Sequence, residues 1–213
     1  MIVVNFKTYS EGTGEEGVGL AGKCSEAAEA TGEKVIVSPP LADLSRYQDL
    51  DLEVFSQHLD PVGTGSHTGH VNAEELLRNN VSGTLINHSE KRIPAEMIEK
   101  AVERCKKTGL TSIVCAQNVE ECEELSRFKP DFIAYEPPEL IGGETSVSEA
   151  KPEVVQEAVK SSKVPVLTGA GIKTIEDVEK SIELGCEGVL IASGVAKNDK
   201  PFEKVVELCR GLK

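Results

Sequence analysis

The sequence predicts an α/β protein, a single (β/α)8 barrel of parallel strands spanning residues 1–213. Short apolar runs recur along the chain, segments with helical spacing separate them, and no linker or low-complexity segment interrupts the alternation. Strands that alternate with helices favour a parallel sheet. An open doubly wound sheet would show the same alternation of strands and helices, but eight strand–helix units in one short chain favour the closed barrel.

The eight predicted strands are short apolar runs, most of them rich in β-branched residues. They cover residues 2–6, 35–37, 54–56, 83–86, 112–116, 132–135, 164–167 and 188–191. No run approaches the ~20 apolar residues of a membrane-spanning helix. The first strand leaves no room for a secretory leader. We therefore expect a cytoplasmic protein that does not enter the membrane.

The predicted helices lie between these strands and carry recognisable end signals. They cover residues 15–30, 73–79, 94–108, 119–126, 152–161, 174–184 and 202–212, and the second unit appears short. Pro94 and Pro152 suit first-turn positions. Gly109 and Gly185 suit C-terminal caps, and Thr174 begins a capping box.

Composition narrows the class of ligand. The chain carries 36 acidic and 23 basic residues, a net charge of −13, which disfavours a nucleic-acid binder. An anionic substrate would therefore need a local positive site. The six cysteines form no CxxC pair, and we expect them to be reduced and mostly buried.

The most informative segment is the end of the sixth strand, where an apolar run stops at Glu136. Two prolines stiffen the chain behind this carboxylate, and Gly142 and Gly143 offer hinges for a moving loop. This pattern is typical of a base on a rigid strand end with a lid attached. The alternative is an ordinary Pro/Gly turn.

Two other strand ends carry polar residues, and functional side chains of such barrels gather at the carboxyl ends of strands. Asn5 and Lys7 end the first strand, where the alternative for Lys7 is a surface lysine. His88 follows the fourth strand, where the alternative is a structural histidine. Amides of a helical turn after His88 would keep its imidazole neutral.

The turns after strands seven and eight are built from small residues. Gly171 lies in the first turn, and Ala192 and Ser193 lie in the second. Both turns can present backbone N–H groups to a phosphate. Their neighbouring strands make a joint phosphate site the favoured interpretation.

Together these residues resemble the triosephosphate isomerase family over essentially the whole chain. Asn5-Phe6-Lys7 is similar to the family's Asn-x-Lys motif. The segment from Asn87 to Arg92 is similar to its His-Ser-Glu-Arg-Arg segment, and Ala134-Tyr135-Glu136-Pro137 is similar to its catalytic glutamate segment. The short chain resembles the compact archaeal branch.

The resemblance implies interconversion of dihydroxyacetone phosphate and D-glyceraldehyde 3-phosphate in glycolysis and gluconeogenesis, through an enediolate and without metal or cofactor. It implies Glu136 as base, His88 as neutral electrophile, Lys7 as cation and Asn5 as the residue that positions the oxygens. Substrate and phosphate contacts are expected at Asn5, Phe6, Lys7, Ile141, Gly142, Gly171, Ala192 and Ser193. Glu90 would pair with Lys7 or a nearby cation, unless it is a solvated carboxylate.

The resemblance also implies an oligomer. The long polar segment after the third strand corresponds to a family loop that enters a neighbour's active site, with Thr68 at its tip. We expect a homodimer at least, and the compact branch favours a homotetramer.

The lid and phosphate turns depart from the more familiar family sequence. Pro138-Glu139-Leu140 replaces Val-Trp-Ala in the lid, so the usual Trp anchor is missing. The turn after strand seven lacks the usual phosphate-binding hydroxyl, which leaves backbone amides for that contact.

Two rival functions remain open. A different phosphate-binding barrel enzyme, such as an epimerase or a synthase, explains the Gly-rich turns but not Lys7, His88 and Glu136 together. A non-catalytic binder of anionic metabolites would not need a base and an electrophile.

Overall fold

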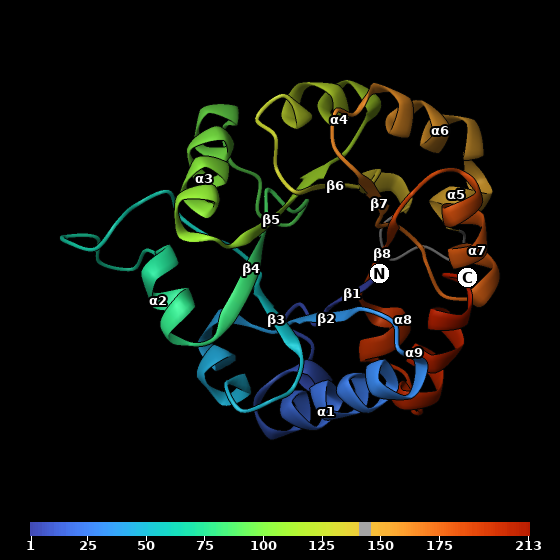
Figure 1. Ribbon diagram of the computed structural model, residues 1–213, viewed down its shortest axis with the longest axis horizontal. Coiled ribbons are helices and arrows are strands. Elements are labelled where there is room, and N and C mark those ends of the chain that lie inside the picture. The colour runs from blue at the N-terminus through green and yellow to red at the C-terminus, as the bar shows by residue number, and fades with distance from the viewer. Residues whose placement is uncertain (141–145) are drawn as a thin grey trace.

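A closed barrel forms the centre of the protein. The computed structural model describes residues 1–140 and 146–213, and over these residues eight parallel strands pair in sequence order (Figure 1). They are β1 (Ile2–Asn5), β2 (Val35–Ser38), β3 (Glu53–Ser56), β4 (Val81–Ile86), β5 (Thr111–Ala116), β6 (Phe132–Tyr135), β7 (Val166–Thr168) and β8 (Gly188–Ile191). Pairing of β1 with both β2 and β8 closes the sheet, so the barrel is confirmed and the open sheet is excluded.

The inside of the barrel is a packed core. Every strand contributes to one cluster of buried side chains: Val3, Ile36, Phe55, Leu85, Ile113, Cys115, Ala134, Leu167 and Leu190. Alternate strand residues fill such interiors in layers. Gly83 is required here, because a Cβ at this position would lie 2.5 Å from the Phe55 ring. The barrel is therefore a solid support for the side chains at its rim.

Helices cover the outside of the barrel (Figure 1). The α-helices of the described residues are α1 (Gly14–Thr31), α2 (Ala73–Arg78), α3 (Ala95–Thr108), α4 (Val119–Ser126), α5 (Val147–Ala150), α6 (Pro152–Ser161), α7 (Ile175–Glu183), α8 (Ser193–Ala196) and α9 (Pro201–Arg210). Short 3-10 helices are η1 (Ser10–Gly12), η2 (Leu41–Tyr47) and η3 (Pro138–Leu140). In the second unit, η2 takes the place of an α-helix.

Most helix-end signals act as the sequence predicts. Thr174 and Asp177 form the capping box of α7, and Gly109 ends α3 in the left-handed conformation with φ 78°. Pro152 is the first residue of α6. Pro94 is the exception, because its ψ of 147° is extended and makes it the N-cap of α3 rather than a first-turn residue.

The prediction for β7 starts too early. The strand covers Val166–Thr168, whereas the apolar run begins at residue 164. Pro165 accepts the Ile133 N–H at 3.0 Å but has no N–H of its own to donate to a strand ladder, so the strand begins after it. The shift brings Thr168 into the strand and sets Gly169 directly at its end.

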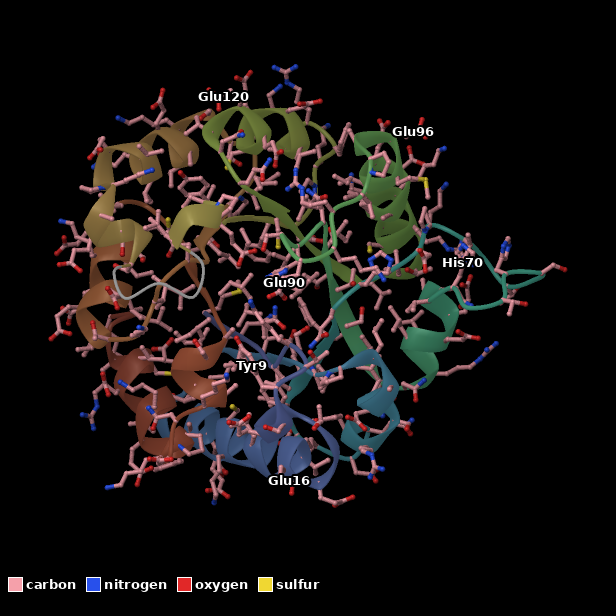
Figure 2. The ribbon with its side chains drawn as sticks, turned by 180° about the vertical axis from the view of Figure 1, so that it is seen from behind. Tyr9, Glu16, His70, Glu90, Glu96 and Glu120 are labelled. Carbon is pink, nitrogen blue, oxygen red and sulfur yellow. The ribbon has the colours of Figure 1, made fainter. Side chains whose placement is uncertain are left out.

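Acidic side chains lie on the outer helices, including Glu16, Glu96 and Glu120 (Figure 2). The connection between β3 and α2 projects from the barrel wall, and His70 lies on it (Figures 1 and 2). Within the described residues, no helix is both long and apolar enough to cross a bilayer.

Candidate active site

A pocket opens where the strands end at their carboxyl termini. Its lining comes from five strand ends: Asn5, Lys7 and Tyr9 from β1, His88 after β4, Glu136 after β6, Gly169, Gly171, Ile172 and Lys173 after β7, and residues 190–194 from β8. The pocket thus brings together Asn5, Lys7, His88 and Glu136, which are far apart in the sequence. Gly171, Ala192 and Ser193 lie on the side formed by β7 and β8.

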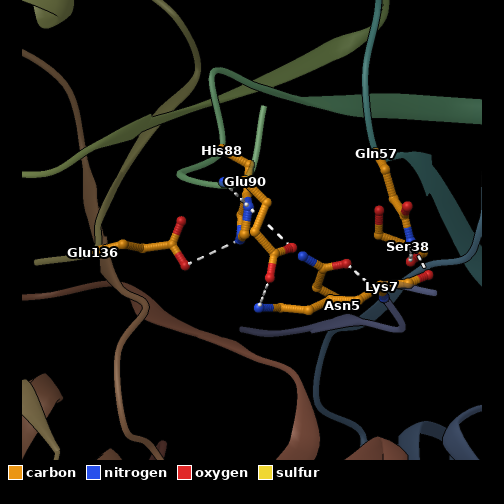
Figure 3. A network of polar contacts seen from close by, with 7 residues as sticks. All are labelled: Asn5, Lys7, Ser38, Gln57, His88, Glu90 and Glu136. Carbon is orange, nitrogen blue, oxygen red and sulfur yellow. Dashed lines mark hydrogen bonds and ion pairs between the residues drawn. The ribbon is translucent and has the colours of Figure 1, made fainter. Parts of the chain in front are cut away.

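Lys7 is held in an unusual backbone conformation, with φ 48°. The Lys7 N–H donates to Asn5 Oδ1 at 2.9 Å, and Gln57 Nε2 donates to the Lys7 carbonyl oxygen at 2.8 Å (Figure 3). Gln57 also donates to the Ser38 carbonyl oxygen at 3.0 Å. Positive φ is costly for a side chain other than glycine, so these bonds hold strained backbone at the rim.

The ammonium group of Lys7 forms an ion pair with Glu90, with 2.8 Å between Nζ and Oε1 (Figure 3). Only 12% of the Lys7 side chain is exposed, whereas 59% of Glu90 is exposed. Solvent screens a pair with such an exposed partner, so it contributes about 0–1 kcal/mol to stability. Its main effect is to direct the Lys7 ammonium along the pocket wall.

His88 is positioned by the turn that follows β4. Asn87, with φ 64°, donates from Nδ2 to the Cys115 carbonyl oxygen at 3.0 Å and accepts the Ile93 N–H at Oδ1. The His88 ring is buried, and its Nδ1 accepts the Glu90 N–H at 3.2 Å. Since an acceptor nitrogen carries no proton, this bond favours the neutral tautomer with the proton on Nε2.

The amide that meets His88 belongs to a turn rather than to a helix, because α3 begins only at Ala95. A turn amide therefore takes the place of the helix amides that the sequence predicts near His88. Burial lowers the pKa of His88, but the Glu136 and Glu90 carboxylates raise it, and the pKa lies above the ordinary histidine value. The contact at Nδ1 favours the neutral ring, whereas the two carboxylates favour the protonated one.

Glu136 lies directly across the pocket from His88. Its Oε1 is 3.6 Å from His88 Nε2, slightly longer than a hydrogen bond (Figure 3). The Glu136 N–H donates to the Ala116 carbonyl oxygen at 2.8 Å, which fixes its backbone to the end of β5. Its Oε2 is buried and has no hydrogen-bond partner among the described residues. A buried carboxylate oxygen without a partner is available to take a proton.

Phe6 and Thr68 do not line this pocket, and two further predicted positions lie outside the described residues. The Phe6 side chain is fully buried, packs against Tyr47 at 6.4 Å between ring centroids, and does not line the pocket. The expected contact of Phe6 with substrate therefore stays a prediction, and it would have to come from the Phe6 backbone. Thr68 is exposed on the projecting connection. Ile141 and Gly142 fall outside the described residues.

Sequence reasoning missed several lining residues, chiefly Tyr9, Gly169 and Lys173. A cation two positions after Gly171 was a usable signal for Lys173. For Tyr9 no local signal existed, because its place depends on how the β1 end turns. Among the described residues, no group of three or more His, Cys, Asp or Glu side chains is placed to hold a metal ion.

Comparison with known proteins assigns the family. Residues 1–209 match the family model described as triosephosphate isomerase. The chain belongs to the triosephosphate isomerase family. Members of this family interconvert dihydroxyacetone phosphate and glyceraldehyde 3-phosphate in glycolysis, and the chain is an aldose–ketose isomerase of this kind, acting on a phosphorylated triose.

Archaeal members of the triosephosphate isomerase family are close in sequence. The enzyme of Methanothermus fervidus is 48% identical over 209 residues, which cover 94% of each chain. That of Methanocaldococcus jannaschii is 43% identical over 216 residues, covering 99% of each chain. The crystal structure from Bartonella henselae shares the fold, with a TM-score of 0.73 at 19% identity over 98% of each chain.

Proposed function

We propose that Glu136 is the general base that moves a proton between the two adjacent carbons of the triose phosphate. The observation that supports this assignment is the buried Glu136 Oε2, which has no hydrogen-bond partner in the part of the chain that the structure describes, in a pocket that also holds His88 and Lys7. Glu136 takes a proton from C1 of dihydroxyacetone phosphate and returns it to C2, which yields glyceraldehyde 3-phosphate. The intermediate is an enediolate.

His88 acts as the electrophile on the two oxygens. Its neutral ring donates from Nε2 to the substrate carbonyl oxygen while the C–H bond breaks, and it then carries protons between O1 and O2. The Glu90 N–H supports this role, because it stabilises the tautomer with the proton on Nε2. A neutral imidazole is a weak acid, and its acidity is therefore close to that of the enediol with which it exchanges protons.

Lys7 offsets the negative charge that develops on the enediolate and part of the phosphate charge. Asn5 holds the Lys7 backbone through its Oδ1, and its remaining amide group positions the substrate oxygens. The strained φ of Lys7 is consistent with a side chain whose direction matters more than local stability.

The phosphate contacts backbone amides near Gly171, Ala192 and Ser193, and we retain Ile141 and Gly142 as contacts from the segment 137–143. Closure of this segment would exclude water and hold the enediolate for reprotonation. The described part of the lid contains η3, Pro138–Leu140.

The first experiment is a coupled isomerase assay with D-glyceraldehyde 3-phosphate on wild type, Glu136→Gln and the matched control Glu179→Gln. Glu179 is exposed on α7 and loses the same charge when amidated. We expect rapid turnover by wild type and control, and a loss of about 10²–10⁴ in kcat for Glu136→Gln. Folded wild type that binds the substrate without converting it would instead indicate a metabolite-binding protein.

Two features of the surface support a proposal of self-association. The connection 57–72 projects from the barrel with Thr68 exposed, and a hollow beside the pocket is lined by Gln57, His58 and Lys91 as well as Asn5 and Lys7. We propose that Thr68 of one copy enters this hollow of another, with a homotetramer favoured over a homodimer. Light scattering across a dilution series tests this, and a monomer at all concentrations would reject it.

We further propose that residues 1–213 form one catalytic domain and that the protein acts in the cytoplasm. The cytoplasmic location is supported by the six cysteines, which are all free and buried, as expected for a reducing compartment. Limited proteolysis tests the single domain, because a stable fragment much shorter than the chain would contradict it.

A further inference from the structure

The pocket must attract a doubly charged phosphate into a protein of net charge −13. Its lining contains two lysines, Lys7 and Lys173. Lys7 already has a carboxylate partner, because its Nζ lies 2.8 Å from Glu90 Oε1. For the Lys173 ammonium, no ion pair with any described residue is present. Among the described residues, therefore, Lys7 has a carboxylate partner and Lys173 has none.

The backbone of Lys173 is fixed on both sides. Its N–H donates to Asp177 Oδ2 at 2.8 Å, within the capping box that Asp177 forms with Thr174 at the start of α7. Its carbonyl oxygen accepts a hydrogen bond from Lys204 Nζ at 3.1 Å. These contacts involve only the main chain of Lys173, whose side chain is half-buried.

The position of Lys173 places its charge on the phosphate side of the pocket. It follows Gly171 and Ile172 in the turn after β7 and lines the same pocket as Ala192 and Ser193 from β8. A lysine ammonium on a flexible four-carbon stem can reach an anion held by neighbouring amides. Its charge also raises the rate at which an anion enters the pocket.

We propose that Lys173 binds the substrate phosphate, in addition to the backbone amides, and makes the enzyme selective for phosphorylated over unphosphorylated trioses. This inference rests on the proposed function, since it assigns the phosphate to the β7 and β8 side. Lys173 acts in binding the substrate and in attracting it to the pocket. Proton transfer itself remains with Glu136 and His88.

The test compares Lys173→Gln, Lys173→Arg and the matched control Lys200→Gln. Lys200 is exposed at the start of α9, outside the pocket lining, and its substitution removes the same charge. For each variant, kcat and KM are measured with D-glyceraldehyde 3-phosphate at several ionic strengths. Inhibition by inorganic phosphate and turnover of D-glyceraldehyde are measured alongside.

For Lys173→Gln we expect about a tenfold rise in KM and in the phosphate inhibition constant, equal to about 1.4 kcal/mol. We expect kcat to change less than threefold, a weaker salt dependence of kcat/KM, and unchanged turnover of D-glyceraldehyde. Arginine should restore most of the loss, and Lys200→Gln should stay within twofold of wild type.

An active wild type whose Lys173→Gln variant keeps its KM and phosphate inhibition constant would overturn the role of Lys173 alone. Equal effects in Lys200→Gln would overturn it as well, because they would reflect net charge only. An inactive wild type would instead reject the proposed function, so the two failures are distinguishable.

Discussion

Gly169→Ala is a direct test of how closely the position of Glu136 controls turnover. Gly169 directly follows β7 and contacts the Glu136 side chain. A Cβ added to Gly169 would lie 2.4 Å from Glu136 Cγ and 3.0 Å from its Oε1. The backbone of Gly169 is outside the left-handed region, so alanine is compatible with its conformation and the effect is one of contact.

The size of the displacement sets the expected loss. Ordinary van der Waals contact begins near 3.4 Å, so the Glu136 side chain and residue 169 must separate by about 1 Å. A misplacement of about 1 Å in a catalytic group costs about 10²-fold in rate, or about 2.7 kcal/mol of barrier. Overpacking of the rim costs a further ~1–3 kcal/mol of stability.

The assay is kcat with D-glyceraldehyde 3-phosphate at a temperature where circular dichroism shows the variant folded. Gly22→Ala is the matched control, because no atom lies within 4 Å of a Cβ at this position in α1. Alanine in the middle of a helix should stabilise the control by about 0.5–1 kcal/mol and leave kcat unchanged. A folded Gly169→Ala enzyme with kcat within threefold of wild type would refute the reasoning.

Three other measurements address the site and its support. In Glu136→Gln the pKa of His88 should fall, because the Glu136 carboxylate raises it, and an NMR titration that shows no fall would contradict the contact. Gly83→Ala should lower stability by at least ~1–3 kcal/mol through the Phe55 contact, and an unchanged Tm would argue against this packing. Burial lowers the pKa of His58 in the folded protein. As pH falls below ~6.5, His58 is therefore protonated in the unfolded chain before it is protonated in the folded one. The stability that His58 contributes is complete above pH ~6.5 and is lost as pH falls towards the folded pKa. Urea unfolding at pH 8 and pH 5.5 should show a smaller loss for His58→Asn than for wild type, and equal losses would rule out this contribution.

Local sequence patterns predicted much of the fold. β-Branched runs, helix caps and glycines at helix ends are decided by neighbours along the chain, which is why eight strands and the capping box at Thr174 follow from the sequence. Helices α5 and α8 were missed because each covers only four residues, too few for an amphipathic period. The start of β7 was misplaced because Pro165 has no backbone N–H to donate to the sheet, and the apolar pattern of the run does not show this.

The sequence by itself determined the alternation of strands and helices and the residues that end the strands, among them Lys7, His88 and Glu136. Only the tertiary structure determined how these side chains come together in one pocket. Barrel closure through β1 and β8, the bond from Gln57 to the Lys7 carbonyl oxygen 50 positions away, and the entry of Lys173 into the pocket all depend on contacts between distant segments. Local propensity does not encode such contacts, because they form only when the strands close into a barrel.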